Sequence, residues 1–513
     1  MPSTTPAPAP FSAPPSSTRQ AEVRLSDGST LAYQVEAGWV VLRDKDRAVA
    51  EVFTVTYTAT PGQDHASGGA RPVTFVFNGG PGAASAYLHL GAVGPQRVAF
   101  DADGSTPPPP ARLVNNAETW LAFTDLVFVD PVGTGFSRAL PDPDASESAD
   151  ERAKRKPGAV EAHERPFYAL DRDLDSLCEV VQRTLSRLGR WLSPVFIAGE
   201  SYGGYRAARL ARRLQEDAGV GLSGVALISP ALEWMTLHAA DYDVQSWVGV
   251  LPSMAAAALH HGRSRAFAPG TPLAEALDAA ERFATERLAP LLLRGDATPR
   301  AEADATLNRL SDLLGLPPAV VAVRGGRVPI TTFVRELLRD QRQVLGLYDA
   351  SMTAPDPFPD REPGAGPDPS LAGISRLFTA GINALLRGEL GVACERPYHL
   401  LNIQVNTSWS VDVDRHALDP LIGAMDDLRY GMALNPHMGV WLAHGYYDLV
   451  TPYYASEMLM ACANLDPTLK KNLLIRHFPG GHMFYSWEAS RVAFRDTMAA
   501  LVARSVAAGP ALR

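Results

Sequence analysis

The chain has 513 residues, 46% of them hydrophobic and 20% charged, which is ordinary for a globular protein and enough for more than one structural unit. The 56 acidic side chains outnumber the 47 basic ones, and the net charge of −9 argues against a nucleic-acid binder because phosphate contacts need a basic surface. No apolar run approaches the roughly 18 to 20 residues that span a bilayer, so we expect no membrane partner. The three cysteines do not suggest a disulfide framework.

The N-terminal 20 residues are rich in Pro, Ser, Thr and Ala, and this composition predicts a disordered tail. The tail has neither the basic nor the apolar region of a signal peptide, so we expect a cytoplasmic protein. Residues 21–60 follow, with β-branched and aromatic runs on both sides of the polar turn 43–47. That pattern predicts strands.

Six short apolar runs predict further strands, and helical patterns such as 168–189, 205–216 and 487–506 separate most of them. Continuous apolar strands that alternate with helices are typical of a mainly parallel sheet with helices on both faces. We therefore predict an α/β fold. The six runs are 71–77, 124–130, 194–199, 224–230, 439–445 and 472–481.

The pattern of alternating strands and helices is interrupted between Pro230 and about Gly431. Residues 272–293 and 327–351 have helical patterns, and 353–370 is a loop rich in Pro and Gly. We interpret the interval as a helical cap over the sheet. A polar stretch at 141–166 predicts a solvated loop. The expected organisation is a tail at 1–20, the first part of the core at 21–230, the cap at 231–430 and the second part of the core at 431–513.

A serine stands between two glycines at the end of the run 194–199. The sequence Gly199-Glu200-Ser201-Tyr202-Gly203 lies where a predicted strand turns into a predicted helix. This is the context of a G-x-S-x-G nucleophile elbow, in which glycines let the turn close and leave the serine hydroxyl exposed. Ser201 is therefore the candidate nucleophile.

A serine hydroxyl needs a base to take its proton, and in α/β-hydrolases the orienting acid and the base follow the serine in the chain. His482 follows the last predicted strand in a glycine-rich loop, whereas His477 lies inside that strand. Asp448 follows the preceding strand, whereas Asp466 precedes a proline in an apparent surface turn. The prediction is Ser201 with His482 as base and Asp448 as acid.

The negative oxygen that forms during acyl transfer needs two backbone N–H donors. One donor comes from the residue after the nucleophile, which is Tyr202. The other comes from a loop after an earlier strand, and the sequence NGGPG at 78–82 follows the run 71–77. Its glycines would let the backbone approach a substrate closely.

Five motifs in this order resemble the serine carboxypeptidase family, over about 70 to 235 and about 390 to 490. They are FVFNGGPGAASAYLHLGAVGP, DLVFVDPVGTGFS, IAGESYGGY, GYYDLVTP and PGGHM. The resemblance implies an α/β-hydrolase fold with a helical insertion, no metal and no cofactor. It also implies that a triad of Ser201, His482 and Asp448 releases C-terminal residues from peptides. The expected partner is therefore a peptide with a free C-terminus.

The resemblance further implies Gly80 and Tyr202 as oxyanion donors, and Asn78 and Glu200 as ligands of the terminal carboxylate of the substrate. A charged Glu200 would repel that carboxylate, so the side chain should be protonated or neutralised. The alternative is that Glu200 only fills a variable position of the elbow.

Two departures from the family pattern concern this site. The family often has a cysteine where this chain has Ala83, so the expected disulfide is absent. A second glutamate is often found where this chain has Ala92. Without that partner, the proton of Glu200 should be held less tightly, because like charges raise a pKa. Carboxylate binding would then depend more on Asn78 or on a basic residue such as Arg206 or Arg97.

Other functions share the same triad, since neither fold nor triad selects the acyl group. The alternatives are a proline-type aminopeptidase, an esterase or an acyltransferase. The motifs DPVGTGFS and GESYGGY favour the carboxypeptidase. A non-catalytic binding scaffold is disfavoured because all three triad residues and both donor positions are present. The sequence does not indicate the oligomeric state.

Overall fold

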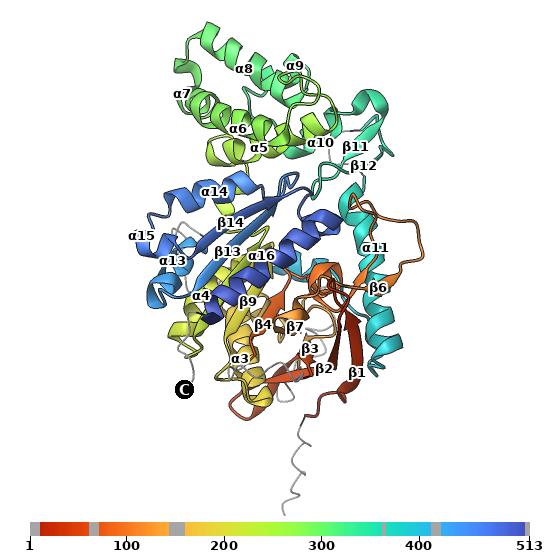
Figure 1. Cartoon of the computed structure of the whole chain (residues 1–513). Coiled ribbons are helices and arrows are strands. Elements are labelled where there is room, and N and C mark those ends of the chain that lie inside the picture. The colour runs from red at the N-terminus through yellow and green to blue at the C-terminus, as the bar shows by residue number, and fades with distance from the viewer. Residues whose placement is uncertain (1–10, 61–70, 143–159, 362–365, 412–421, 508–513) are drawn as a thin grey trace, which may run out of the picture.

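A ten-stranded sheet forms the centre of the computed structural model, which describes residues 11–60, 71–142, 160–361, 366–411 and 422–507 (Figure 1). The strand order is β1-β2-β3-β7-β4-β9-β10-β13-β14, and β8 pairs with β3. In this order, the neighbouring strands from β7 through β4, β9, β10 and β13 to β14 pair in parallel. The pairs among β1, β2, β3, β7 and β8 are antiparallel. The strands are β1 (Ser17–Arg24), β2 (Thr30–Asp44), β3 (Arg47–Ala59), β4 (Val73–Phe77), β7 (Asp125–Val129), β8 (Arg138–Ala139), β9 (Val195–Glu200), β10 (Leu222–Ile228), β13 (Gly439–Gly445) and β14 (Leu473–Phe478).

The six apolar runs predicted as strands of a parallel sheet are β4, β7, β9, β10, β13 and β14. Every residue of β4, β7, β9 and β13 is buried, because side chains on both faces of these strands are covered. A mainly parallel sheet between helices, with a helical insertion before its last two strands, is an α/β-hydrolase fold. The predicted fold class is confirmed.

Apolar side chains form one cluster on each face of the sheet. One cluster joins Ile197 of β9 to Leu210 of α4, and the other joins Phe196 of β9 to Phe494 of α16. Successive residues of a strand point to opposite faces, so the two clusters lie on opposite sides. The longer helices of the first cluster include α3 (Leu170–Leu188), α4 (Tyr202–Glu216) and α13 (Met425–Leu434), and those of the second include α11 (Pro369–Asn383) and α16 (Glu488–Ala507).

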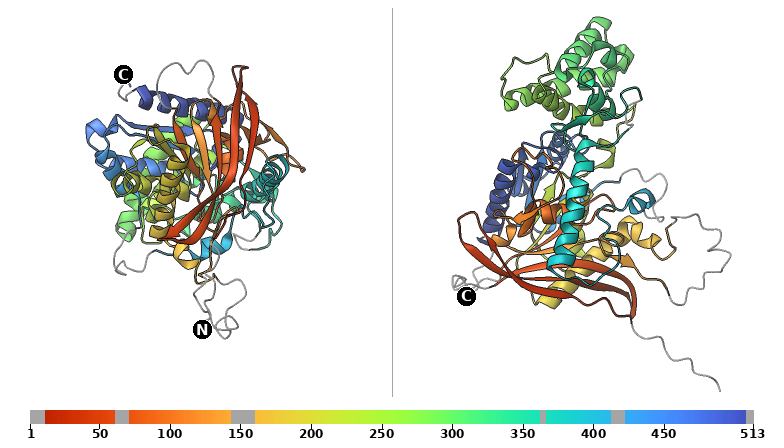
Figure 2. Two further views of the ribbon diagram at one scale, coloured as in Figure 1. Left: turned by 90° about the horizontal axis from the view of Figure 1, so that it is seen from below. Right: turned by 90° about the vertical axis from the view of Figure 1, so that its right-hand side faces the viewer.

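The interval between β10 and β13 contributes helices to three apolar clusters, and α13 belongs to the first cluster described above. One group of helices lies beyond one end of the sheet (Figure 1) and has an apolar core of its own. In contrast, α11 runs along the side of the sheet (Figure 2) and places Phe378 in the apolar cluster that contains Phe494. The helices of the separate group are α5 (Gln245–His260), α6 (Leu273–Phe283), α7 (Ala289–Arg294), α8 (Arg300–Leu314), α9 (Pro318–Ala322) and α10 (Ile330–Glu336).

The helical prediction for 327–351 is wrong beyond α10. The chain forms a short 3-10 turn at Arg339–Gln341, and Arg342 has a positive φ of 55°, which a continuing helix does not allow. The next residues form β11 (Gln343–Leu345), which pairs antiparallel with β12 (Thr353–Pro355). The connection between these two strands reaches the site described below.

The predicted end of the disordered tail at residue 20 is also wrong, because β1 begins at Ser17. Ser17 pairs with Ala37 of β2, and its hydroxyl donates to the carbonyl of Leu390. Pairing with a long neighbouring strand satisfies the backbone of this polar segment, which composition alone does not indicate. Residues 1–10 and, within the polar stretch 141–166, residues 143–159 lie outside the described part of the chain.

The three cysteines are all free thiols, and Cys178 and Cys394 are buried whereas Cys462 is exposed. None of the described helices combines the length and the apolar content needed to cross a bilayer. Within the same described ranges, no cluster of three or more His, Cys, Asp or Glu side chains has the geometry of a metal site.

Candidate active site

Ser201 lies between the last residue of β9 and the first residue of α4, in a strained backbone conformation. Its φ is 61° and its ψ is −124°, a region that non-glycine residues rarely adopt and that is typical of functional turns. The turn is held by hydrogen bonds from Ser201 N–H to the carbonyl of Ile228 at 2.9 Å and from Ala231 N–H to the carbonyl of Ser201 at 3.0 Å. A Cβ atom on Gly199 would lie 1.9 Å from the carbonyl oxygen of Gly203, so the tight turn requires glycine.

Asp448 and His482 form a buried pair. Nδ1 of His482 lies 2.7 Å from Oδ2 of Asp448, and Asp448 has no exposed surface. Oδ1 of Asp448 accepts the backbone N–H groups of Val450 and Thr451 at 2.8 and 3.0 Å, and the Thr451 hydroxyl donates to Oδ2 at 2.6 Å. These bonds fix the carboxylate, which in turn orients the imidazole so that its Nε2 is left for a substrate or nucleophile.

The charges around His482 favour its protonated form. Burial lowers the pKa of His482, but the charge and hydrogen bond of Asp448, together with the charge of Glu200, outweigh burial and raise the pKa above its ordinary value. An imidazole with these neighbours is suited to accept a proton from a hydroxyl and to hold it during reaction.

The loops of Ser201 and His482 meet at the end of β10. Ser201 N–H donates to Ile228, and the hydroxyl of the next residue, Ser229, donates to the carbonyl of His482 at 2.8 Å. The Thr451 hydroxyl also lies 3.0 Å from the carbonyl of Ser229. The described residues include no hydrogen bond from the Ser201 hydroxyl to His482.

The alternative acid and base considered in the sequence have other environments. His477 lies in β14, 3.6 Å from Glu457, and burial lowers its pKa to about 4, so it is a poor base near neutral pH. Asp466 is exposed and caps α15 (Pro467–Lys470) by accepting the N–H of Thr468 at 2.8 Å. Neither side chain takes part in the Asp448–His482 pair.

The glycines of the NGGPG segment lie against the start of α4. A Cβ atom on Gly79 would lie 2.4 Å from the backbone nitrogen of Tyr202 and 2.8 Å from that of Gly203, so only glycine fits. Gly80 has a φ of 101°. In the described part of the chain, the N–H groups of Gly80 and Tyr202 donate to no other group. These two N–H groups are the oxyanion donors that the sequence predicts.

Asn78 and Glu200, the predicted carboxylate ligands, are buried and bonded to each other. Nδ2 of Asn78 donates to Oε2 of Glu200, and the hydroxyl of Tyr485 donates to Oε1 at 2.8 Å. Oδ1 of Asn78 accepts the N–H of Leu88 at 2.9 Å, which orients the amide. Asn78 and Glu200 thus form one hydrogen-bonded group next to the nucleophile.

Glu200 keeps its proton to higher pH than an ordinary glutamate, and the comparison with a site that has a second acid at position 92 stays a prediction. Complete burial raises the pKa of Glu200 to about 7, although His482 and the bonds from Tyr485 and Asn78 act in the opposite direction. Desolvation alone disfavours the carboxylate form of Glu200, so its pKa is raised although no second acid stands at position 92.

The two basic residues considered as substitute ligands have other partners. Arg206 is buried, lies 2.7 Å from Asp173 and donates to the backbone carbonyl of Asn78 at 3.0 Å. It therefore supports Asn78 and does not face a substrate. Arg97, in β5 (Gln96–Val98), donates to the carbonyl of Val98 at 3.3 Å, and no bond to Glu200 or Asn78 occurs among the described residues.

The connection between β11 and β12 contributes to the site, which sequence reasoning missed. The N–H of His482 donates to the carbonyl of Tyr348 at 2.5 Å, and the N–H of Gly481 donates to Oδ2 of Asp349 at 2.9 Å. The ring of Tyr348 lies edge-on to His482 with centroids 5.3 Å apart. No motif marks these residues. By contrast, Thr451 and Tyr485 lie three positions after Asp448 and His482, and this spacing could have indicated both.

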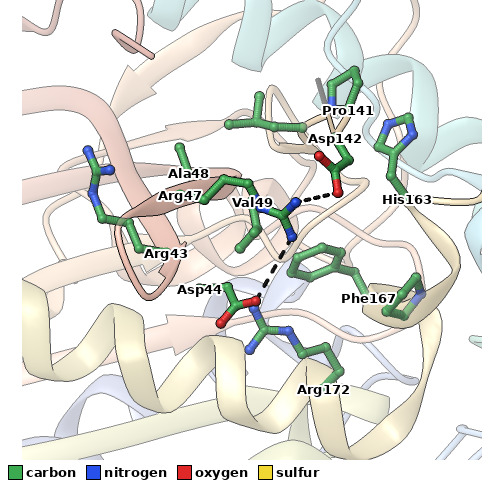
Figure 3. Close-up of a pocket in the computed structure, with 12 residues that line it drawn as sticks. Arg43, Asp44, Arg47, Ala48, Val49, Pro141, Asp142, His163, Phe167 and Arg172 are labelled. Carbon is green, nitrogen blue, oxygen red and sulfur yellow. Dashed lines mark hydrogen bonds and ion pairs between the residues drawn. The ribbon is translucent and has the colours of Figure 1, made fainter. Parts of the chain in front are cut away.

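A separate pocket of about 360 Å³ lies between the turn that joins β2 to β3 and the start of α3 (Figure 3). Its charged side chains include Arg47, which pairs with Asp142 and lies 3.9 Å from Asp44, and Arg172, which stacks on Phe167. None of the candidate residues lines this pocket.

The family model of the serine carboxypeptidases matches residues 30–244. The resemblance inferred from the motifs is therefore confirmed over a part of the chain that includes Ser201 and ends before Asp448. Together with the fold, the match supports a hydrolase of the serine peptidase type. No curated protein sequence matches the chain.

Three solved structures illustrate the range of similar folds. Proline iminopeptidase from Mycobacterium smegmatis is 15% identical, with 96% of this chain and 100% of that chain covered and a TM-score of 0.35. An acetylester hydrolase from Corynebacterium glutamicum is 11% identical, with 95% and 96% covered and a TM-score of 0.36. A carboxyl esterase from Bacillus coagulans is 12% identical, with 95% and 98% covered and a TM-score of 0.29. At these scores the matches do not discriminate among substrates.

Proposed function

We propose that the protein is a serine carboxypeptidase-like peptidase, which releases C-terminal residues from peptides through an acyl-enzyme on Ser201. The observation that carries the proposal is the buried group of Asn78, Glu200 and Tyr485 beside Ser201. A protonated carboxyl and an amide can both bind a carboxylate, and an enzyme that acts on internal or N-terminal bonds has no need of such a group at this position.

In the proposed reaction, Ser201 Oγ attacks the carbonyl carbon of the last peptide bond while His482 Nε2 takes the hydroxyl proton. Asp448 holds the imidazole and stabilises its positive charge. The N–H groups of Gly80 and Tyr202 bind the negative oxygen of the tetrahedral intermediate. His482 then gives its proton to the leaving nitrogen, so the C–N bond breaks and the terminal amino acid departs.

A water molecule completes the cycle. His482 takes one proton from the water as its oxygen attacks the acyl-enzyme carbonyl, and the proton passes to Ser201 Oγ as the ester bond breaks. The shortened peptide leaves with a new carboxylate, and the enzyme returns to its starting state.

Two peptides test the direction of hydrolysis. One has an acetylated N-terminus and a free C-terminus, and the other has a free N-terminus and an amidated C-terminus. Mass spectrometry should detect stepwise loss of C-terminal residues from the first peptide only, and Ser201→Ala should abolish it. Loss of N-terminal residues from the second peptide would instead identify an aminopeptidase. A sulfonyl fluoride should inactivate the enzyme, and a chelator should have no effect.

A further inference from the structure

The loop that carries His482 also brings a tyrosine back to the nucleophile elbow. Tyr485 lies in the 3-10 turn η9 (Phe484–Ser486), has no exposed surface, and packs with its ring 6.0 Å from that of Phe494. Its hydroxyl donates to Oε1 of Glu200 at 2.8 Å. Each carboxyl oxygen of Glu200 therefore has one side-chain donor, since Asn78 donates to the other.

The ring of Tyr485 packs onto the segment that lacks the second acid. A Cβ atom on Gly91, in the π-helical turn η1 (His89–Val93), would lie 2.4 Å from Cε2 of Tyr485. Ala92, where serine carboxypeptidases often have a glutamate, is the next residue and is buried. The small residues Gly91 and Ala92 leave room for the phenol ring of Tyr485, and a larger side chain at Gly91 would displace that ring.

We infer that Tyr485 is a positioning residue that holds Glu200 for recognition of the substrate's terminal carboxylate, and that this recognition is lost when Glu200 ionises. This inference rests on the proposed function. A phenol differs from a carboxyl in one respect that matters here, because it keeps its proton to a much higher pH and so donates its hydrogen bond throughout the neutral range.

The titratable groups near Glu200 come from four segments, and Tyr87 among them stays neutral because burial raises its pKa to about 12. They are His482 and Asp448 from the loops after β14 and β13, Tyr485 from η9, and Tyr87 from α1 (Ala86–Leu88). Burial raises the pKa of Glu200 to about 7 and keeps the pKa of Tyr485 well above its ordinary value. Below about pH 7, Glu200 is thus an acid that can donate to a carboxylate, and above it the charge repels one.

The bond from Tyr485 favours the ionised form of Glu200, because an O–H group donates more strongly to a carboxylate than to an acid. Removal of that hydroxyl should leave the proton on Glu200 to higher pH. Removal of a phenol that does not donate to Glu200 should have no such effect, and Tyr87 provides this comparison, since no bond from its hydroxyl to Glu200 occurs in the described part of the chain.

The test is the KM of an acetylated peptide with a free carboxylate between pH 6 and pH 8, beside the same peptide as its C-terminal ester. For the wild type, KM of the free peptide should rise about tenfold as Glu200 ionises, with no rise for the ester. In Tyr485→Phe the rise in KM should occur at a pH about one unit higher, so that KM at pH 8 is only about twice its value at pH 6. In Tyr87→Phe the wild-type profile should remain.

The variant Glu200→Gln tests the same inference without altering Tyr485. The KM of this variant for the free peptide should not depend on pH between pH 6 and pH 8. A tenfold rise retained in Glu200→Gln, or a wild-type profile in Tyr485→Phe, would overturn the inference.

An infrared titration separates this inference from the proposed function. The carboxyl band of Glu200 is identified by its absence in Glu200→Gln, and its midpoint should move upward by about one pH unit in Tyr485→Phe. If neither substrate is hydrolysed, the proposed function fails while the titration still reports on Tyr485. An unchanged midpoint in Tyr485→Phe would show that the phenol does not control Glu200.

Discussion

The sheet core and the group of helices α5–α10 with the adjoining β11–β12 hairpin contribute to the site in different ways. The core supplies the residues of the proposed triad, since Ser201, Asp448 and His482 all follow strands at one end of the parallel sheet. The hairpin supplies Tyr348 and Asp349, which bind the backbone of the loop that carries His482. The residues of the proposed triad stand in sequence motifs. The groups that hold the His482 loop, the Tyr348 carbonyl and the Asp349 carboxylate, stand in none.

The largest effect should come from the nucleophile and the base, which the core supplies. Ser201→Ala and His482→Ala should each lower kcat by about 10⁴-fold or more, because either change removes acyl transfer to the serine. Steady-state kinetics on the free-carboxylate peptide measure this loss, and the melting temperature checks that the variants fold. His477→Gln is the matched control and should keep kcat within about twofold. If His477→Gln were as inactive as His482→Ala, the assignment of the base would be wrong.

The acid of the core should have the next effect. Asp448→Asn should lower kcat by roughly 10³- to 10⁴-fold, because the amide no longer fixes the imidazole in the tautomer that leaves Nε2 free. Asp466→Asn, at the exposed cap of α15, is the comparison and should leave kcat unchanged. A normal pH profile and normal kcat in Asp448→Asn would contradict the role given to the Asp448–His482 pair.

A smaller effect should come from Asp349, through which the hairpin holds the His482 loop. Asp349→Ala removes the acceptor of the Gly481 N–H and should lower kcat about 10- to 100-fold with little change in KM, since a misplaced base slows the chemical step. Asp340→Ala removes an exposed acid of the 3-10 turn that precedes β11 and should change neither value. An unaltered kcat in Asp349→Ala would mean that the core holds His482 without the hairpin.

The sequence predicted the elements that depend on local pattern. The strands of the parallel sheet, the helix after Ser201 and the loop position of His482 follow from apolar runs and glycines within a few residues of each other. The bonds of Asp349 and Arg206 could not be predicted, because they join segments 132 and 33 residues apart with no spacing rule. A protonated or neutralised Glu200 was expected from its place beside a substrate carboxylate, but the cause of its raised pKa, which is complete burial, could not be read from the sequence.

The smallest effect should come from Glu457, an acid between the core and the separate group of helices. Glu457 lies in α14 (Tyr453–Cys462), and burial together with the charge of Glu281 on α6 raises its pKa to about 7. His477 lies 3.6 Å away but does not neutralise it, because burial lowers the pKa of His477 to about 4.

The sign of the pH dependence follows from the raised pKa of Glu457. The unfolded chain loses this proton near pH 4.5 and the folded chain near pH 7, so the free energy of unfolding falls as pH rises between these values. Since the side chain of Glu457 is 33% exposed, water screens much of the effect. Glu457→Gln should therefore raise the melting temperature by about 1 °C at pH 8 and leave it unchanged at pH 4. Calorimetry at both pH values measures this, and a lower melting temperature at pH 8 would mean that ionised Glu457 stabilises the junction between α14 and α6.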